Sequence, residues 1–316
     1  MSTPQWVIIG SGYIAREWIL AIQSGDHGNI TVVARNPRAM SALTAEFPTI
    51  NTYRIGSDIA RTAIGNGDFI IVCTSIISTI DIARHVLELR KEHAVILLEK
   101  PGFDFSVALS DFTLDPGLAM AGIHVAYNRR FYDGAQRFKS DFQRIYQSSD
   151  EMDVRVGISE DFSSIDNEKF PSRVASNWVL ANTIHIIDLV TFVMESAGID
   201  FLDAFPPEGV VWGVENRFRI RTRHAVINLT IEARADRPGW YFEAENKLES
   251  ISLRPLERFS HTTGGQELIK IEAELPKPGY KNMVTRLTLG DLNDFPSFER
   301  NLERLLCVQD IFKQPA

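Results

Sequence analysis

Short apolar runs alternate with amphipathic segments over the first hundred residues. Mainly apolar residues fill 6–9, 30–34, 69–73 and 94–98, and the segments after the first three runs repeat at helical spacing. A strand with one wet face would alternate polar and apolar residues, so continuous apolar strands indicate a parallel sheet covered by helices on both faces. The pattern therefore predicts an α/β fold that begins with a doubly wound parallel sheet.

The pattern changes after residue 153. Residues 154–158, 217–222 and 225–233 alternate polar and apolar side chains, which is typical of antiparallel strands with one wet face. Helices are expected over 177–195 and 298–312, where apolar residues recur at helical spacing. The second part of the chain is therefore expected to be an α+β domain.

The chain length fits two domains, because a domain takes roughly 150 residues. We place them at residues 1–123 and 124–316, with a last helix that can pack back onto the first domain. A hydrophobic share of 44% suffices for a sizeable core. Lys and Arg number 33 against 41 Asp and Glu, a net charge of -8. Without a basic excess, nucleic acid is not expected as a partner.

Cysteine usage and the start of the chain indicate a cytoplasmic protein. The two cysteines, Cys73 and Cys307, build neither a disulfide framework nor a zinc spacing. The histidines share no spacing with acidic residues that would make a metal site, so no metal is expected. The first apolar stretch, residues 6–9, is too short for a signal peptide or a membrane span, so no membrane partner is expected either.

A glycine-rich turn follows the first apolar run. Gly10 permits a tight turn, Gly12 lets a pyrophosphate approach the backbone, and the small Ala15 allows the next helix to pack on the strand. The N-terminus of that helix faces the anion. The order of strand, turn and helix therefore predicts a dinucleotide site made by Gly10, Gly12, Tyr13, Ile14 and Ala15. The alternative is a glycine turn that holds no ligand.

The end of the second apolar run bears on the choice of cofactor. NAD-specific sites usually carry an acidic residue there for the ribose hydroxyls, but Ala34 and Arg35 occupy this corner. A guanidinium can form forked hydrogen bonds to a 2′-phosphate. We therefore favour NADP(H) over NAD(H), with Arg35, Asn36 and Arg38 as cofactor contacts. The alternative is that the arginines are solvated surface residues.

The fourth apolar run ends in Glu99, Lys100 and Pro101, and open parallel sheets bind ligands at the carboxyl ends of their strands. The proline fixes the backbone of Lys100 in an extended conformation. An amine held there can hydrogen-bond a substrate oxygen and exchange a proton near neutral pH, and the alternative is an exposed lysine at a strand end. These three residues, with Thr74 and Ser75 after the third run, are predicted to contact the cofactor.

Four motifs together resemble one family. Gly-Ser-Gly-Tyr-Ile-Ala at 10–15, Glu-Lys-Pro at 99–101, Ala-Tyr-Asn-Arg-Arg-Phe at 126–131 and His-Ile-Ile-Asp at 185–188 follow the order and spacing of the Gfo/Idh/MocA oxidoreductases. The resemblance covers the whole chain. It implies an N-terminal Rossmann domain and a C-terminal α+β domain whose large, mostly antiparallel sheet binds substrate and often serves oligomerisation.

The resemblance also implies roles for single residues. It places Lys100 beside the nicotinamide and the substrate, gives Pro101 a cis peptide bond, and turns His185 toward the reacting carbon. Many relatives carry an aspartate four residues before this histidine, but here that residue is Ala181. His185 is therefore expected to be a weaker base, because a carboxylate would orient the imidazole and stabilise its charged form. The predicted catalytic residues are Lys100, His185 and Tyr127.

Substrate contacts are predicted from both sides of these motifs. Asn128 and Arg130 can bind substrate hydroxyls, a carboxylate or a phosphate, or they can be structural polar groups that tie the domains together. Trp178 and Asn182 are the further candidates, although Asn182 lies one residue too late to share the helix face of the missing aspartate. Asp188 is expected to support the helix or the histidine.

These observations predict an NADP(H)-dependent oxidoreductase that transfers a hydride to or from a carbinol or ketone carbon. The expected substrate is a small molecule, a sugar or a sugar-like metabolite. Two alternatives stay open: a non-catalytic regulatory protein that senses the dinucleotide, and an imine reductase of a biosynthetic pathway. A broad apolar-faced sheet would favour a homo-oligomer, either a dimer or a tetramer.

Overall fold

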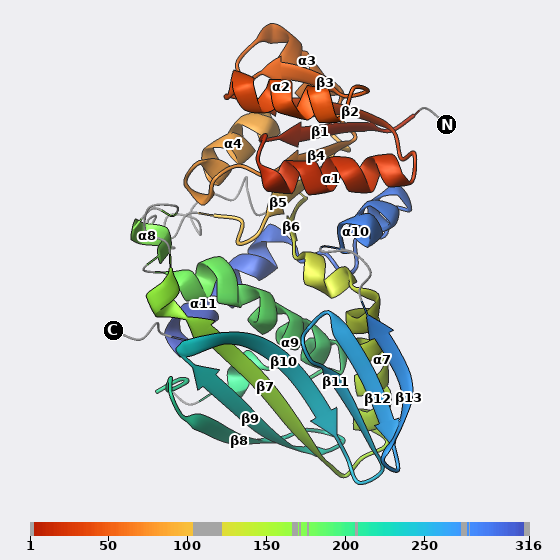
Figure 1. Ribbon diagram of the computed structural model, residues 1–316, viewed down its shortest axis with the longest axis vertical. Coiled ribbons are helices and arrows are strands. Elements are labelled where there is room, and N and C mark those ends of the chain that lie inside the picture. The colour runs from red at the N-terminus through yellow and green to blue at the C-terminus, as the bar shows by residue number, and fades with distance from the viewer. Residues whose placement is uncertain are drawn as a thin grey trace. The chain divides into compact units, whose positions relative to one another are not determined.

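The protein is described by a computed structural model that covers residues 3–103, 122–165, 170, 172–175, 177–205, 208–272, 277 and 279–312 (Figure 1). The chain divides into two compact units. The first consists of residues 1–127 and 280–302, and the second of residues 128–279 and 303–316. The chain thus returns to the first unit near its end.

A parallel sheet forms the centre of the first unit. Among the described residues, six strands follow the order β3-β2-β1-β4-β5-β6. The direction of winding reverses beside β1, which in doubly wound folds places ligands at the carboxyl ends of the neighbouring strands. The strands are β1 Gln5–Ile9, β2 Asn29–Ala34, β3 Asn51–Arg54, β4 Phe69–Val72, β5 Val95–Glu99 and β6 Ile123–Ala126.

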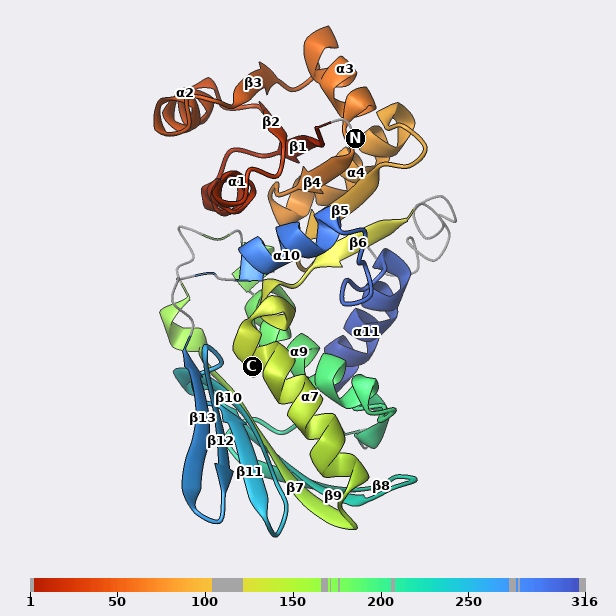
Figure 2. The ribbon, with the colours of Figure 1, turned by 90° about the vertical axis from the view of Figure 1, so that its right-hand side faces the viewer.

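Helices cover both faces of this sheet, as the continuous apolar strands predict. Figure 2 shows α1 and α2 on one face and α3 and α4 on the other. Ile8, Val32 and Ile71, from three neighbouring strands, are completely buried between these layers. The helices are α1 Tyr13–Ser24, α2 Pro37–Glu46, α3 Asp58–Asn66 and α4 Ile76–Leu89.

Two elements of the first unit lie outside the predicted strands and helices. Strand β3 reads Asn-Thr-Tyr-Arg and lies at the edge of the sheet, where its residues are only partly buried. It contains no apolar run that would mark it. Helix α3 has apolar residues at helical spacing, Ile59, Ala60, Ala63 and Ile64, but it spans only nine residues, fewer than a test of periodicity needs.

The C-terminal segment completes the first unit beside β6. The Val125 amide donates to the Pro296 carbonyl over 3.0 Å, and His124 forms an antiparallel bridge with Ser297. The Tyr280 ring packs edge-on against Trp18 of α1 with centroids 5.1 Å apart. Two helices belong to this segment, α10 Gly279–Thr288 and α11 Phe298–Ile311. Residues 303–311 of α11 belong to the second unit.

A mixed sheet forms the second unit. Among the described residues, seven strands follow the order β13-β12-β11-β10-β7-β9-β8. Strand β7 pairs with β9 in parallel, whereas the other neighbouring pairs are antiparallel, which confirms the predicted fold class. The strands are β7 Glu151–Asp161, β8 Glu215–Arg221, β9 Val226–Arg234, β10 Asp236–Glu245, β11 Glu249–Leu253, β12 Arg258–Thr263 and β13 Gln266–Glu272.

Two long helices cover one face of this sheet, α7 Asp133–Gln147 and α9 Ile184–Ser196 (Figure 2). Phe138 of α7 packs on Phe242 of β10 with ring centroids 4.5 Å apart. Among the described residues, the stretch 179–196 alone is long and apolar enough to cross a membrane, and 78% of it is buried inside the protein. Such burial is typical of a core helix. Short helical turns complete the unit: η1 Asn128–Phe131, η2 Phe162–Ser164, α8 Ser172–Ala175, the π-helix η3 Val179–Thr183 and η4 Leu202–Ala204.

The two faces of the sheet bear on the expected oligomer. One face is polar, as the alternating strands predict, and the apolar face, which the expectation of an oligomer uses, is the one that α7 and α9 cover. Hydroxyl groups and ion pairs occupy the open face, including Ser252 beside Ser260 at 2.8 Å and Arg254 beside Glu243 at 2.8 Å. The apolar argument for an oligomer is therefore wrong, and the oligomeric state stays a prediction without it.

A polar cluster joins α7 to β11 and β12. Both terminal nitrogens of Arg144 bind the two carboxylate oxygens of Glu249, at 2.6 and 2.7 Å. His261 Nε2 lies 2.8 Å from the same carboxylate, and its Nδ1 lies 3.5 Å from Asp141. The hydrogen bonds from Arg144 hold the pKa of Glu249 below its usual value, and those from His261 add to this effect.

Glu249→Gln is expected to lower the free energy of unfolding at pH 7 by about 1 kcal/mol, since Arg144 is half-exposed and solvent screens the pair. Because the folded pKa is depressed, the stabilisation is present above the unfolded pKa of about 4.3 and is lost as the pH falls through the folded pKa. Denaturant titrations from pH 7 to pH 3 should therefore show the difference between variant and wild type shrinking. Glu267→Gln, exposed on β13, is the control, and equal stabilities at pH 7 would contradict the assignment.

Candidate functional site

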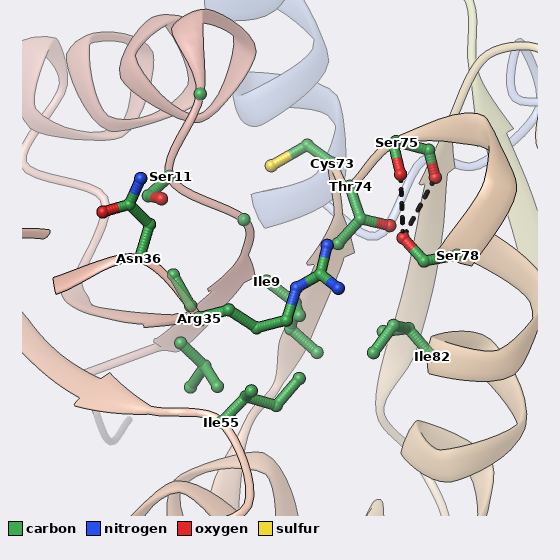
Figure 3. Close-up of a pocket in the computed structure, with 14 residues that line it drawn as sticks. Ile9, Ser11, Arg35, Asn36, Ile55, Cys73, Thr74, Ser75, Ser78 and Ile82 are labelled. Carbon is green, nitrogen blue, oxygen red and sulfur yellow. Dashed lines mark hydrogen bonds between the residues drawn. The ribbon is translucent and has the colours of Figure 1, made fainter. Parts of the chain in front are cut away.

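A pocket opens at the carboxyl ends of β1, β2 and β4, as the winding of the sheet predicts. Its volume is about 280 Å³. Figure 3 shows side chains from all three strand ends converging on it, with Arg35 pointing inward. Ser11 lines it together with six residues that are predicted to contact a cofactor: Gly10, Gly12, Arg35, Asn36, Thr74 and Ser75.

Glycine occupies positions 10 and 12 of the turn for two different physical reasons. Gly10 has a φ of +132°, and a Cβ there would lie 2.5 Å from the carbonyl oxygen of Cys73 at the end of β4. The close approach of β1 and β4 therefore demands glycine. A Cβ at Gly12 would meet no atom of the described residues within 4 Å. That empty space faces the pocket and suits a ligand that approaches the backbone.

The helix after the turn leaves its N-terminus available. Gly12 is the N-cap of α1, and within the described part of the chain no side chain caps this end. Uncapped amide groups and the helix dipole attract an anion. Ala15 is completely buried against the sheet, whereas the side chain of Tyr13 is mostly exposed and does not line the pocket. The backbone of the turn, rather than the Tyr13 side chain, therefore shapes the pocket.

The positively charged side chain at the pocket, that of Arg35, follows strand β2. Arg35 is exposed at the pocket, and Arg38 is exposed in the first turn of α2. The Asn36 carboxamide oxygen accepts from the amides of Arg38 and Ala39 at 3.0 and 3.3 Å, so it caps α2. Asn36 therefore holds the turn that carries the two arginines.

The wall opposite consists of β4 and the start of α4. Thr74 lies 3.4 Å from Thr79, and Ser75 lies 3.1 Å from Ser78, hydroxyl to hydroxyl. Burial raises the pKa of the Cys73 thiol well above its usual value. The thiol therefore lines this wall in its neutral form.

The residues before and after Lys100, at the end of β5, are each held in place. The Lys100–Pro101 peptide bond is cis, as the resemblance implies. Glu99 accepts a hydrogen bond of 2.7 Å from the Trp18 indole, so its carboxylate is used inside the protein. Lys100 itself is half-buried.

Tyr127 is buried inside the first unit, and its hydroxyl group is hydrogen-bonded there. Its side chain is 1% exposed, and its hydroxyl donates to Oδ1 of Asn301 over 2.8 Å. Asn301 was not among the candidate residues. It lies on α11, and its Nδ2 donates to the Pro101 carbonyl oxygen over 3.0 Å.

The second unit places His185 on the first turn of α9, half-buried beside Trp240 of β10, with ring centroids 6.3 Å apart. The Arg129 guanidinium lies 4.4 Å above the same Trp240 ring. These three side chains form an aromatic and cationic group that extends from η1 to the sheet.

A buried glutamate organises the turn before His185. Glu160 is 7% exposed and accepts hydrogen bonds from Trp178 at 3.2 Å, Asn182 at 2.9 Å and Thr183 at 3.0 Å. Burial raises its pKa, although these three hydrogen bonds and Arg129 oppose the shift. Trp178 and Asn182, predicted as substrate contacts, thus direct these N–H groups to Glu160.

Glu160 had a detectable signal in the sequence. It continues the inward-facing series of β7, in which alternate residues from Met152 to Ile158 are buried. A charged residue in a buried register needs partners, because burying an unpaired charge is costly. That combination could have marked Glu160 as a candidate.

Arg130 and Asn128 have hydrogen-bond partners within the second unit. Arg130 is 3% exposed and forms a forked pair with Asp188, at 2.7 Å from Nε and 2.5 Å from Nη2. Arg304 binds the same carboxylate at 2.8 Å. Asn128 is buried and donates to the Tyr132 hydroxyl over 3.4 Å. Asp188 therefore supports α9, as expected. No group of three metal-binding side chains occurs among the described residues.

Comparison with known proteins identifies the fold. A scan against protein-family models finds no match, and neither does a comparison with curated sequences. A Gfo/Idh/MocA family oxidoreductase from Vibrio cholerae superposes with a TM-score of 0.65 at 13% identity, over 97% of this chain and 94% of that one. The chain has the fold of the Gfo/Idh/MocA oxidoreductases. The resemblance seen in the four sequence motifs is thereby confirmed at the level of fold.

Other structures with this fold differ in function. An oxidoreductase from Agrobacterium radiobacter, in complex with NAD⁺, L-tartaric acid and magnesium, superposes with a TM-score of 0.66 at 14% identity, over 98% and 95% of the two chains. The transcriptional regulator Gal80p from Kluyveromyces lactis superposes with a TM-score of 0.68 at 8% identity, over 98% and 89%. Function must therefore be argued from the site.

The two glycines give a matched pair of variants. Gly10→Ala is expected to destabilise the protein by about 2 kcal/mol or more, because of its positive φ and the clash with Cys73. Gly12→Ala is expected to change stability by less than about 1 kcal/mol, because alanine tolerates its extended backbone and the added Cβ meets nothing. Thermal and denaturant unfolding measure both. Equal losses would show that the turn is not built as described.

Proposed function

We propose that the protein is an NADP(H)-dependent oxidoreductase that transfers a hydride to or from a carbinol or ketone carbon of a sugar-like small molecule. The observation that carries the proposal is the pocket of the first unit. An uncapped helix N-terminus, a glycine with open space above it and an inward-pointing arginine converge there. This combination suits a phosphorylated dinucleotide better than an uncharged ligand.

Different residues of the pocket bind different parts of the dinucleotide. The amide groups at the start of α1 hold the pyrophosphate, and Gly12 lets it approach. Arg35, with Arg38 behind it, binds the 2′-phosphate through charge-assisted hydrogen bonds. Thr74 and Ser75 line the opposite wall with hydroxyl groups. When bound, the nicotinamide ring supplies or accepts the hydride.

The substrate needs a proton partner on the oxygen of the reacting carbon. Lys100 is assigned this role, because its backbone is held at the carboxyl end of β5 and its half-buried amine can give or take a proton. His185 remains the predicted second group, with Glu160 fixing the turn before it. The L-tartaric acid bound by the oxidoreductase from Agrobacterium radiobacter carries two carbinol carbons, which supports a polyhydroxylated substrate.

A non-catalytic, dinucleotide-sensing role is the second candidate. Two observations favour it: Gal80p, a transcriptional regulator, shares the fold, and Ala181 stands where the resemblance implies an aspartate before His185. A measurement of turnover distinguishes the oxidoreductase from the sensor. Saturable binding of NADPH without oxidation on a panel of keto-sugars would favour the sensor, and oxidation with cyclic imines alone would indicate an imine reductase.

The choice of cofactor gives one test of the proposed function. Calorimetry is expected to show tighter binding of NADP(H) than of NAD(H), and Arg35→Ala should lower NADP(H) affinity by about 10- to 100-fold, the worth of a charge-assisted hydrogen bond. NAD(H) affinity should change little. Arg61→Ala, exposed on α3 and outside the pocket, is the matched control. Tighter NAD(H) binding by the wild type would contradict the assignment of the arginine.

Lys100→Met gives a further test of the proposed function. The variant should bind the dinucleotide like the wild type and lose turnover by about 10²-fold or more, because general acid–base catalysis contributes that much. Lys91→Met is the control, since Lys91 pairs with Asp68 away from the pocket. Steady-state rates and calorimetry measure both quantities. Wild-type turnover in Lys100→Met would remove the lysine from the mechanism.

A further inference from the structure

Asn301 makes a buried connection to the residue that follows Lys100. Its side chain is completely buried, and Nδ2 donates to the Pro101 carbonyl oxygen over 3.0 Å while Oδ1 accepts from the Tyr127 hydroxyl over 2.8 Å. A carbonyl oxygen can only accept, so Nδ2 must face Pro101 and Oδ1 must face Tyr127. The orientation of the amide is thus set by its two partners.

The rest of the corner is anchored as well. Gly102 has a φ of +90°, and its amide donates to the Glu99 carbonyl over 3.0 Å. The Glu99 carboxylate accepts from Trp18, and Phe103 is completely buried. Every residue around Lys100 from 99 to 103 is therefore held by buried contacts or by the turn itself.

We propose that Asn301 is a positioning residue that sets the place of the Lys100 amine through the carbonyl of Pro101, and that Tyr127 keeps Asn301 oriented for this task. The inference rests on the proposed function of Lys100. It assigns Tyr127 a part in the geometry of the corner instead of a direct proton transfer. A shift of about 1 Å in a reacting group can cost about 100-fold in rate, so a single buried hydrogen bond can matter.

Asn301→Asp is the sharpest variant. It keeps the shape of the side chain and an acceptor for Tyr127, but an ionised carboxylate cannot donate to Pro101 and repels its carbonyl. At a pH where this buried carboxyl group is ionised, we expect kcat to fall by about 10- to 100-fold with the dinucleotide affinity nearly unchanged. Tyr127→Phe leaves the bond to Pro101 in place and should lower kcat by a smaller factor.

The pH profile separates positioning from general damage. As the pH falls, the introduced carboxyl group binds a proton and can donate to the Pro101 carbonyl again. The ratio of the kcat of Asn301→Asp to that of the wild type should therefore rise toward acid pH. A ratio that stays constant from acid to alkaline pH, or a variant with wild-type kcat at alkaline pH, where the buried carboxyl group is ionised, would overturn the proposal.

A destabilised control excludes a mere loss of folding. Ile64→Ala removes a buried side chain of α3 in the same unit and should lower the midpoint of thermal unfolding while leaving kcat of the folded protein unchanged. If Ile64→Ala and Asn301→Asp lose kcat in proportion to their unfolding midpoints, Asn301 is a stability residue only.

A chemical readout keeps the test independent of the proposed reaction. The rate at which acetic anhydride labels the Lys100 amine, followed by mass spectrometry, depends on the position and pKa of that amine whether or not a substrate is turned over. Asn301→Asp should change this rate several-fold relative to the labelling of Lys91 in the same molecule. An unchanged labelling rate would overturn the positioning role of Asn301. A changed labelling rate in a protein that shows no turnover would contradict only the proposed function.

Discussion

The contact between the ends of β1 and β4 is the constraint on which the first unit depends. There the backbone of Gly10 comes so close to the Cys73 carbonyl that a Cβ would lie 2.5 Å from its oxygen. This approach lets the chain turn immediately into α1, so the helix N-terminus opens onto the same pocket as Thr74 and Ser75. With a larger residue the two strand ends would have to separate. The open helix N-terminus at the pocket therefore follows from a packing requirement at Gly10, two residues before the N-cap of α1.

The parts of this arrangement that arise from local sequence could be predicted. Continuous apolar runs predicted the parallel sheet, and the spacing of Gly10, Gly12 and Ala15 predicted the turn, because each of these features acts within a few residues. The polar strand β3 gave no apolar run to predict it, and the nine residues of α3 are too few for its periodicity to be decisive. Asn301 could not be found either. Its hydrogen bond with Tyr127 joins residues 174 positions apart, and an asparagine in a helix gives no local sign of it.

The second unit shows how burial can redirect residues that look functional in sequence. Arg130, Trp178 and Asn182 are typical substrate-binding residue types, yet their side chains bind buried carboxylates of the same unit. Glu160 loses the solvation of its charge on burial, and three neutral donors together with Arg129 compensate in part. Sequence shows residue types but not burial, so it could not separate these internal pairs from groups that face a ligand. Arg129 and His185, both beside Trp240, remain half-buried.

Stability alone gives no reason for the polar corner at Lys100. A buried hydrogen bond contributes only about 1 kcal/mol net, and well-packed apolar side chains of similar shape can be as stable as a polar pair. A network of Tyr127, Asn301 and the Pro101 carbonyl is demanding, because each member left without its partner would cost more than the bond contributes. What such a network provides, and apolar packing does not, is direction: the amide fixes one backbone carbonyl at one angle. A residue that only fills a strand end needs no such control, whereas an amine that must meet a reacting atom does.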